Sequence, residues 1–192
     1  AFVGYQTYAV TQLIQNRYIM KIIANARDGR GKSLKRFTKS VNRKNKGLNA
    51  TNNKALSLSK GKYIVRLDAD DFLNENALLL MVKELESNEE IGLVFSDYYL
   101  VDKLGTIITE EKRHDFKKVS LFDQPAHGAC TMIRKSVLKE VGGYSKEFSR
   151  QDGYELWIKI SKYKKVSNIN LPLFNYRKHG ENLTEDKEKL YA

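Results

Sequence analysis

The chain has 192 residues, 41% of them hydrophobic, which suits one compact domain, and its apolar stretches are too short to span a membrane. Its formal net charge is +11, but the lysines and arginines are spread along the chain without the signature motifs of nucleic-acid-binding modules, so we expect no specific nucleic-acid partner. Cys130 is the only cysteine and no charged-then-apolar leader opens the sequence, so we expect no intramolecular disulfide, no signal peptide and a reducing, cytoplasmic location.

Taken in chain order, the apolar patterns predict helices that alternate with short strands. Helices are expected at 7–15, 33–37, 49–58, 74–85, 134–141 and 154–163. Strands are expected at 18–24, 63–67, 91–99, 166–169 and 174–177. Asn74 can cap the helix that follows it, and Gly142 and Gly143 stop the helix before them. This alternation predicts the α/β class, in which helices cover a sheet.

Three carboxylates stand at the end of the predicted strand 63–67, in the stretch LDADD. Two ionised carboxylates ~4 Å apart repel each other by about 4 kcal/mol at an effective dielectric of 20. One interpretation is a turn with a helix N-cap, although Asn74 already fills the cap role. The other is a site for Mg²⁺ or Mn²⁺, because Asp68, Asp70 and Asp71 supply the hard oxygen ligands that these ions prefer.

Four further residues are candidates for a site. Asp28, which follows a predicted strand, is either a turn residue or an acceptor for a ligand in the crevice beyond that strand. Asp152, just before a predicted helix, is either an N-cap or a general base. Gly128 belongs to a small-residue turn that would let the backbone approach a ligand. His179 is a lone histidine, a residue that is most often merely a surface or core residue.

The positive charge also has two interpretations. A solvated, lysine-rich surface is the simpler one. The other is attraction to an anionic partner, such as a membrane surface, a phosphorylated lipid carrier or an acidic glycan.

Several stretches, in their order and spacing, resemble the motifs of the family 2 glycosyltransferases, which are nucleotide-sugar-dependent enzymes with the GT-A fold. They are AVTQLIQNRYIMKIIANARDG, NKGLNATNNKALSLSKGKYIVRLDADD, HGACTMIRKSVLKEVGGYSKEF, RQDGYELWIKI and LPLFNYRKHGENLT. Arg27 replaces the first aspartate of the family's Asp-Asp-Gly turn, and Asn52 stands where an arginine is frequent. The family's longer first strand is reduced to AFVGYQTYAV, which leaves open whether the N-terminal edge is complete.

The resemblance implies a GT-A fold with a mixed, mostly parallel sheet flanked by helices. It implies a single domain over 1–192, with a nucleotide-binding part about 1–100 and an acceptor-side part about 101–192. The implied activity is inverting transfer from a nucleotide diphospho-sugar, expected to be a UDP-sugar, to a glycan or lipid-linked hydroxyl acceptor in cell-surface glycan synthesis. A peripheral contact with the inner face of an anionic membrane stays open. The alternative is a nucleotide- or anionic-glycan-binding protein of the same fold without turnover.

The resemblance also implies individual roles. The expected ligands of Mn²⁺ or Mg²⁺ are Asp70, Asp71 and His179. The expected donor-binding residues are Asp28, Asp68, Asp70 and Gly128, with Asp28 at the nucleobase. Asp152 would take the proton of the acceptor hydroxyl as its oxygen attacks the anomeric carbon.

Overall fold

The computed structural model describes residues 6–14, 17–27, 33–41, 48–68, 70–113, 129–145, 147 and 152–178. For the three segments before residue 48, and for residues 152 and 153, it describes the backbone alone.

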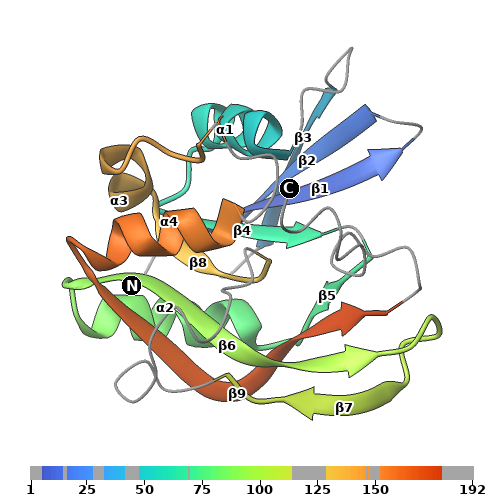
Figure 1. Cartoon of the computed structure of the whole chain (residues 1–192). Coiled ribbons are helices and arrows are strands. Elements are labelled where there is room, and N and C mark those ends of the chain that lie inside the picture. The colour runs from blue at the N-terminus through green and yellow to red at the C-terminus, as the bar shows by residue number, and fades with distance from the viewer. Residues whose placement is uncertain are drawn as a thin grey trace.

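The described elements form a sheet with helices on both faces (Figure 1). The strands are β1 (Gln6–Ile14), β2 (Arg17–Arg27), β3 (Ser33–Val41), β4 (Tyr63–Asp68), β5 (Phe72–Leu73), β6 (Ile91–Val101), β7 (Ile107–Glu111), β8 (Met132–Arg134) and β9 (Lys165–Arg177). The helices are α1 (Leu48–Leu58), α2 (Ala77–Ser87), α3 (Lys135–Glu140) and α4 (Asp152–Ser161). The strand order is β3-β2-β1-β4-β8-β6-β9-β5, and β7 pairs with β6.

The sheet is mixed, as expected, but it is not mostly parallel. Of the eight strand pairings in the described part, only β1 with β4 and β6 with β9 are parallel. The main reason is that β8 is antiparallel to both of its neighbours and β2 is antiparallel to β1 and β3. The α/β class is therefore confirmed, whereas the mostly parallel sheet is wrong.

Strands β4, β6 and β9 run in one direction, because β8 is antiparallel to β4 and β6, and β9 is parallel to β6. Their carboxyl ends therefore share one edge, which we call the carboxyl edge. The opposite end, where these strands begin, is the amino edge.

Two predicted helices near the N-terminus are strands instead. Residues 7–14 of the first one fall on β1, which pairs with β2 and, in parallel, with β4, so that Tyr8 lies opposite Val65, and residue 15 lies outside the described residues. Residues 33–37 fall on β3, which pairs with β2. Both segments carry β-branched or aromatic residues, and pairing with neighbouring strands overrides a weak helix propensity. The predicted strand 18–24 is confirmed as part of β2.

From α1 onward the predicted elements are confirmed within a few residues, with two differences. The helix expected to begin after Asn74 starts at Ala77, because Asn74 Oδ1 accepts the backbone N–H of Asn76 (3.2 Å) in a turn that precedes the helix. The two C-terminal strands are one continuous strand, β9, whose register against β6 shifts around Pro172. A proline is tolerated in a strand at such an irregularity.

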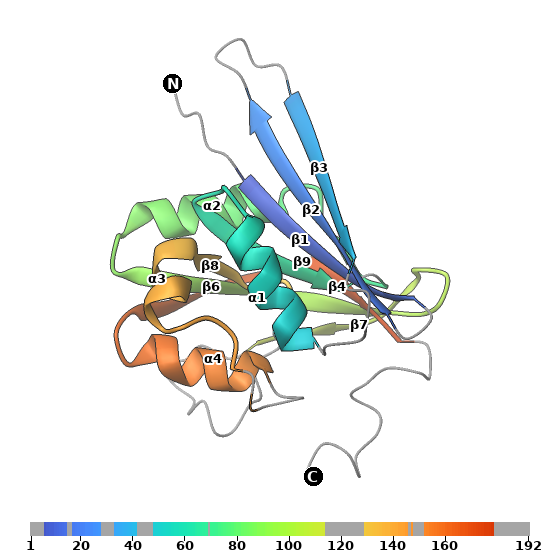
Figure 2. The ribbon, with the colours of Figure 1, turned by 90° about the horizontal axis from the view of Figure 1, so that it is seen from above.

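Buried hydrophobic side chains form two clusters, one on each face of the sheet. Under α2, Met81 and Leu85 pack with Phe174 of β9. Under α3 and α4, the Trp157 ring lies 4.6 Å from that of Phe95, between ring centroids. Trp157 is thus a core residue. Figure 2 shows β2 and β3 extending beyond the part of the sheet that the helices cover.

The turn after α3 is held by α1. Gly142 and Gly143 have φ of 82° and 72°, the left-handed conformation that ends helices, as the sequence predicts. Asn53 then binds the backbone of Tyr144 twice: its Oδ1 accepts the N–H (2.9 Å), and its Nδ2 donates to the carbonyl (2.7 Å). A Cβ on Gly143 would lie 2.6 Å from Asn53 Oδ1, so this close contact requires glycine.

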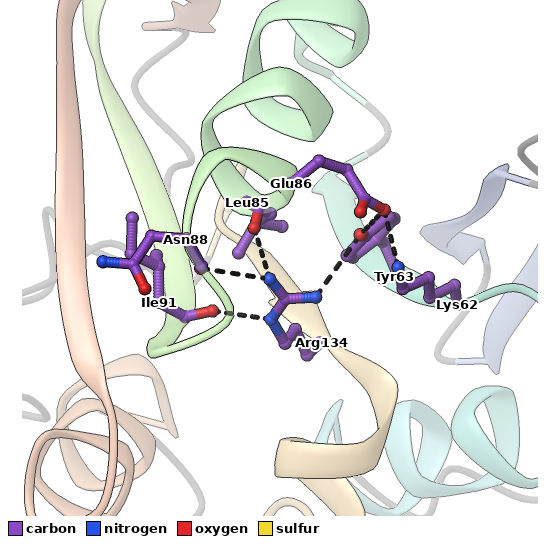
Figure 3. Close-up of polar contacts among 7 residues, drawn as sticks. All are labelled: Lys62, Tyr63, Leu85, Glu86, Asn88, Ile91 and Arg134. Atoms are coloured by element: carbon purple, nitrogen blue, oxygen red, sulfur yellow. Dashed lines mark hydrogen bonds and ion pairs between the residues drawn. The ribbon is translucent and has the colours of Figure 1, made fainter. Parts of the chain in front are cut away.

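The buried Arg134 hydrogen-bonds to several elements at the amino edge (Figure 3). Arg134 Nε donates to the Ile91 carbonyl (2.7 Å), and Nη2 donates to the carbonyls of Leu85 and, at 3.3 Å, Asn88. Its Nη1 donates to Tyr63 Oη at 3.4 Å. The last carbonyls of a helix lack hydrogen-bond donors within the helix, and Arg134 supplies donors to those at the end of α2. The same side chain joins β4, β6 and β8.

Candidate functional site

The acidic residues at the end of β4 lie at the carboxyl edge. β4 is buried along Tyr63–Arg66 and ends at Asp68. The Asp71 N–H then donates to the Asp68 carbonyl (3.2 Å), closing a turn. The three predicted acids therefore lie at, or just after, the end of a buried strand, as the sequence predicts.

Asp68 is engaged by a neighbouring arginine. Arg66 is 7% exposed, and its Nε lies 3.1 Å from Asp68 Oδ1 while its Nη2 donates to Oδ2 at 3.3 Å. Such two-point guanidinium–carboxylate contacts are among the stronger polar interactions. In this structure, Asp68 balances the charge of Arg66.

Asp71 lacks such a partner. Its side chain is 8% exposed, Oδ1 accepts the Arg177 N–H (2.9 Å), and the buried Oδ2 accepts no hydrogen bond among the described residues. Burial raises the pKa of Asp71 to about 7, and the charges of Asp68 and Asp70 add to the rise. Near neutral pH this carboxyl is therefore poised between its charged and neutral forms.

Arg177, at the end of β9, holds in place the turn that carries Asp68, Asp70 and Asp71, which we call the acidic turn. Its Nε donates to the Asp70 carbonyl (2.8 Å), and its Nη1 donates to the carbonyls of Asp102 (3.3 Å) and Lys103 (2.6 Å). One side chain thus joins the acidic turn to the β6–β7 turn. The sequence pattern does not indicate that Arg177 links these two turns, although Arg177 lies two residues before His179 in the YRKH motif.

Cys130 borders the acids from the start of β8. Its N–H donates to the Arg66 carbonyl (2.8 Å), its φ is 53°, and its side chain is buried. Burial raises the pKa of the thiol strongly, with a further contribution from the charge of Asp71, while Arg113 opposes the rise. The thiol therefore stays neutral at physiological pH and lies near both Asp71 and Arg113.

The remaining predicted site residues are only partly placed. Gly128, His179 and Asp28 lie outside the described residues. β2 ends at Arg27 and runs opposite to β1 and β4, so it ends at the amino edge. Asp152 begins α4, and its side chain is not described.

The direction of α4 bears on Asp152. The helix ends at Ser161, shortly before β9 begins at the amino edge, where the Lys165 N–H donates to the Glu90 carbonyl (2.9 Å). In Figure 1, α4 runs opposite to β4, so its first turn lies toward the carboxyl edge. Within the described part of the chain, no three His, Cys, Asp or Glu side chains gather as a metal site, and no helix is long and apolar enough to span a membrane.

Comparisons with known proteins agree on one family. A sequence model described as Glycosyl transferase family 2 matches residues 20–142. An uncharacterized glycosyltransferase of Methanocaldococcus jannaschii is 32% identical over 160 residues, covering 79% of this chain and 55% of the relative. An Escherichia coli chondroitin synthase is 26% identical over 148 residues, covering 77% of this chain and 22% of the synthase.

A further relative is WfaP of E. coli, a UDP-Glc:alpha-D-GlcNAc-diphosphoundecaprenol beta-1,3-glucosyltransferase, 29% identical over 155 residues, with 75% of this chain and 57% of that protein covered. The chain therefore spans about half of two of these relatives and less of the synthase. Among solved structures, TarS 1–349 of S. aureus in complex with UDP-GlcNAc gives a TM-score of 0.58 at 16% identity, covering 76% of this chain and 43% of that one. At this identity the likeness establishes the GT-A fold.

Proposed function

Because the chain belongs to glycosyl transferase family 2, we propose that it moves a sugar from a nucleotide diphospho-sugar to a hydroxyl acceptor in cell-surface glycan synthesis. The observation that carries this proposal is the pair of carboxylates Asp70 and Asp71 at the carboxyl edge, within the matched residues. The name of WfaP, and the TarS complexes with UDP-GlcNAc and UDP, support a UDP-sugar as donor. The names of WfaP and of chondroitin synthase support a lipid-linked or glycan acceptor.

The carboxylates fit a divalent cation, Mn²⁺ or Mg²⁺. Both ions prefer hard oxygen ligands, and the buried Oδ2 of Asp71 accepts no hydrogen bond from any described residue. Asp70 and Asp71 would hold the ion, with His179 as a further ligand. That assignment is supported by β9, which ends beside Asp71 two residues before His179. When bound, the ion offsets the charge that develops on the departing diphosphate.

The chain's own residues have three tasks in this mechanism. Arg177 holds the acidic turn in one position through the Asp70 carbonyl. Asp152 takes the proton of the acceptor hydroxyl while that oxygen forms its bond to the anomeric carbon. The bond from that carbon to the diphosphate breaks in the same displacement, so the anomeric centre is inverted. The position of the first turn of α4 toward the carboxyl edge supports this role for Asp152.

The test is a panel of UDP- and CMP-sugars with Mn²⁺, scored by thermal shift and by hydrolysis of the donor. We expect one donor class to stabilise the protein and to be hydrolysed slowly. Asp70→Asn should remove the dependence of binding on Mn²⁺, whereas Glu110→Gln, which removes an exposed carboxylate on β7, should not.

The outcomes separate the candidate functions. Stabilisation by a nucleotide sugar without hydrolysis or transfer would favour the binding protein without turnover. Donor binding that EDTA leaves unchanged in the wild-type protein would reject the cation. No response to any nucleotide sugar would reject the proposed function.

A further inference from the structure

On one side, β6 pairs first with β8 and then with β7, with a gap between the two pairings in the described part of the chain. β8 pairs with Leu93 and Val94 of β6, and β7 pairs with β6 from Tyr98 onward. Residues 95–97 therefore have no strand partner on this side in the described part of the chain. The start of β8 and the carboxyl end of β4 border this gap, because Cys130 binds the backbone of Arg66.

Arg113, just beyond the end of β7, lies at the gap. Its N–H donates to Asp97 Oδ1 (2.7 Å). Its guanidinium carbon lies 5.5 Å from the ring centroid of Tyr98 and 5.9 Å from that of Phe95, within the range of cation–π contacts. The hydrogen bond of its backbone N–H and the contacts with the two rings limit the positions that the Arg113 side chain can take.

The guanidinium of Arg113 lacks a conventional partner. It is half-buried, and within the described residues it forms no ion pair and donates no hydrogen bond. Burial lowers the pKa of the guanidinium, and electrostatic interactions with Tyr98, Cys130 and Asp97 oppose this effect. A cation withdrawn from water normally requires an anion or hydrogen-bond acceptors. Arg66 and Arg177 at the same edge both have them.

The position of Arg113 relates it to the acidic turn. Cys130 donates its N–H to the Arg66 carbonyl (2.8 Å), two residues before Asp68, and the charges of both Asp71 and Arg113 act on its thiol. A ligand bound at the acids would therefore have its anionic part close to an arginine without an anionic partner among the described residues.

We propose that the guanidinium of Arg113 binds the diphosphate of the donor nucleotide at the carboxyl edge. This inference rests on the proposed function. The planar fork of a guanidinium matches two phosphate oxygens, and the aromatic rings hold it ready before the ligand arrives. As the bond to the anomeric carbon breaks, Arg113 would stabilise the negative charge that the diphosphate gains.

The test measures the affinity of Arg113→Met for uridine, UMP and UDP by calorimetry. Methionine keeps an unbranched apolar side chain against the rings but removes the charge. We expect the affinity for UDP to fall by about 10- to 100-fold, the usual cost of losing charge-assisted hydrogen bonds, and that for uridine to stay unchanged. Arg113→Lys should lie between Met and wild type. Lys112→Met, at the exposed neighbour, is the matched control.

The outcomes distinguish this inference from the proposed function. If wild-type protein binds UDP and Arg113→Met binds it equally well, the Arg113 assignment is wrong and the proposed function stands. An equal loss for uridine and UDP would show a structural role and would also overturn it. If wild-type protein binds no nucleotide, both proposals fail. Thermal unfolding identifies a misfolded variant, and Arg113→Lys then provides the test.

Discussion

Arg134 at the amino edge and Arg113 at the carboxyl edge are both withdrawn from water, but their surroundings differ. Arg134 donates to three backbone carbonyls and one hydroxyl, so every part of its guanidinium has a partner (Figure 3). Arg113 lies on two rings and has no hydrogen-bond acceptor for its guanidinium among the described residues. The hydrogen bonds of Arg134 stabilise the fold, whereas the guanidinium of Arg113 can still bind a ligand.

The carboxylates repeat this difference within the acidic turn. Asp68 is paired with Arg66, whereas Asp71 keeps a buried oxygen without a partner in the described residues. We therefore assign Asp68 to the scaffold and Asp71 to the site. Substitutions at the two kinds of position should therefore change different measurements.

The largest expected effect is on catalysis, at Asp152. Asp152→Asn keeps the shape of the side chain but removes its basicity, and a general base contributes typically 10²–10⁴-fold. We expect transfer to a hydroxyl acceptor to fall by roughly this factor, with donor affinity and stability almost unchanged, because Asn caps helices about as well as Asp. The measurement is initial transfer rate beside nucleotide titration and thermal unfolding. Transfer at the wild-type rate would return Asp152 to the role of an N-cap.

Arg134 should show the opposite behaviour. Arg134→Met leaves the carbonyls of Leu85, Asn88 and Ile91 without their donor, and we expect a loss of about 3–5 kcal/mol in the free energy of unfolding. Arg113→Met should cost less than about 1 kcal/mol. Urea denaturation of both variants measures the difference. Equal costs would mean that both arginines are structural, and the comparison would fail.

The fold could be predicted where a segment's pattern suits one structure only. Residues 91–99, rich in β-branched and aromatic residues, and 154–163, with apolar residues on one helical face, are confirmed as β6 and α4. Residues 7–15 were ambiguous because their short apolar pattern fits a helix as well as a strand, and pairing with β2 and β4 decided the outcome. Strand direction depends on such pairings, which explains why the mostly parallel sheet was wrong.

The acids of the site could be predicted because they follow an apolar strand directly in sequence. Arg177 and Arg113 could not, because contacts between distant residues define their roles. Arg177 lies 107 residues from Asp70 in sequence, and nothing local indicates that they meet. Arg113 stands in a charged stretch whose composition suggests a solvated surface, and only its contacts with the rings of Tyr98 and Phe95 show otherwise.

A smaller effect is expected from the buried carboxyl of Asp71 in metal-free protein. Its pKa rises on folding from the ordinary value of 3.8 to about 7, so the folded state holds the proton at pH values where the unfolded state has lost it. Stability should therefore fall as pH rises from about 4 to about 7. In EDTA at pH 8, Asp71→Asn should be more stable than wild type by about 1–3 kcal/mol.

Asp68→Asn is the matched control for this prediction. It leaves the buried Arg66 without its carboxylate, so it should destabilise the protein at the same pH. Chemical denaturation at pH 4.5 and 8 measures both variants. A destabilised Asp71→Asn would show that the carboxylate has partners that outweigh its burial.

The smallest effect is expected at the solvent-facing end of the Arg134 network. Glu86 accepts hydrogen bonds from Tyr63 Oη and from Lys62 Nζ (2.7 Å), and these lower its pKa, with the Lys62 bond as the largest cause. The Lys62 side chain is 59% exposed and that of Glu86 33%, so water and salt screen the ion pair.

Glu86→Gln should therefore cost at most about 1 kcal/mol at pH 7, because the Gln carbonyl can still accept the Tyr63 hydroxyl. A lowered pKa contributes stability that is lost as pH falls through the folded value, so wild type and variant should converge below the ordinary Glu value of 4.5. They should also converge in high salt. Urea midpoints at pH 7 and pH 3, with and without salt, measure this. A cost near that of Arg134→Met would show that Glu86 holds Tyr63, and through it Arg134, in place.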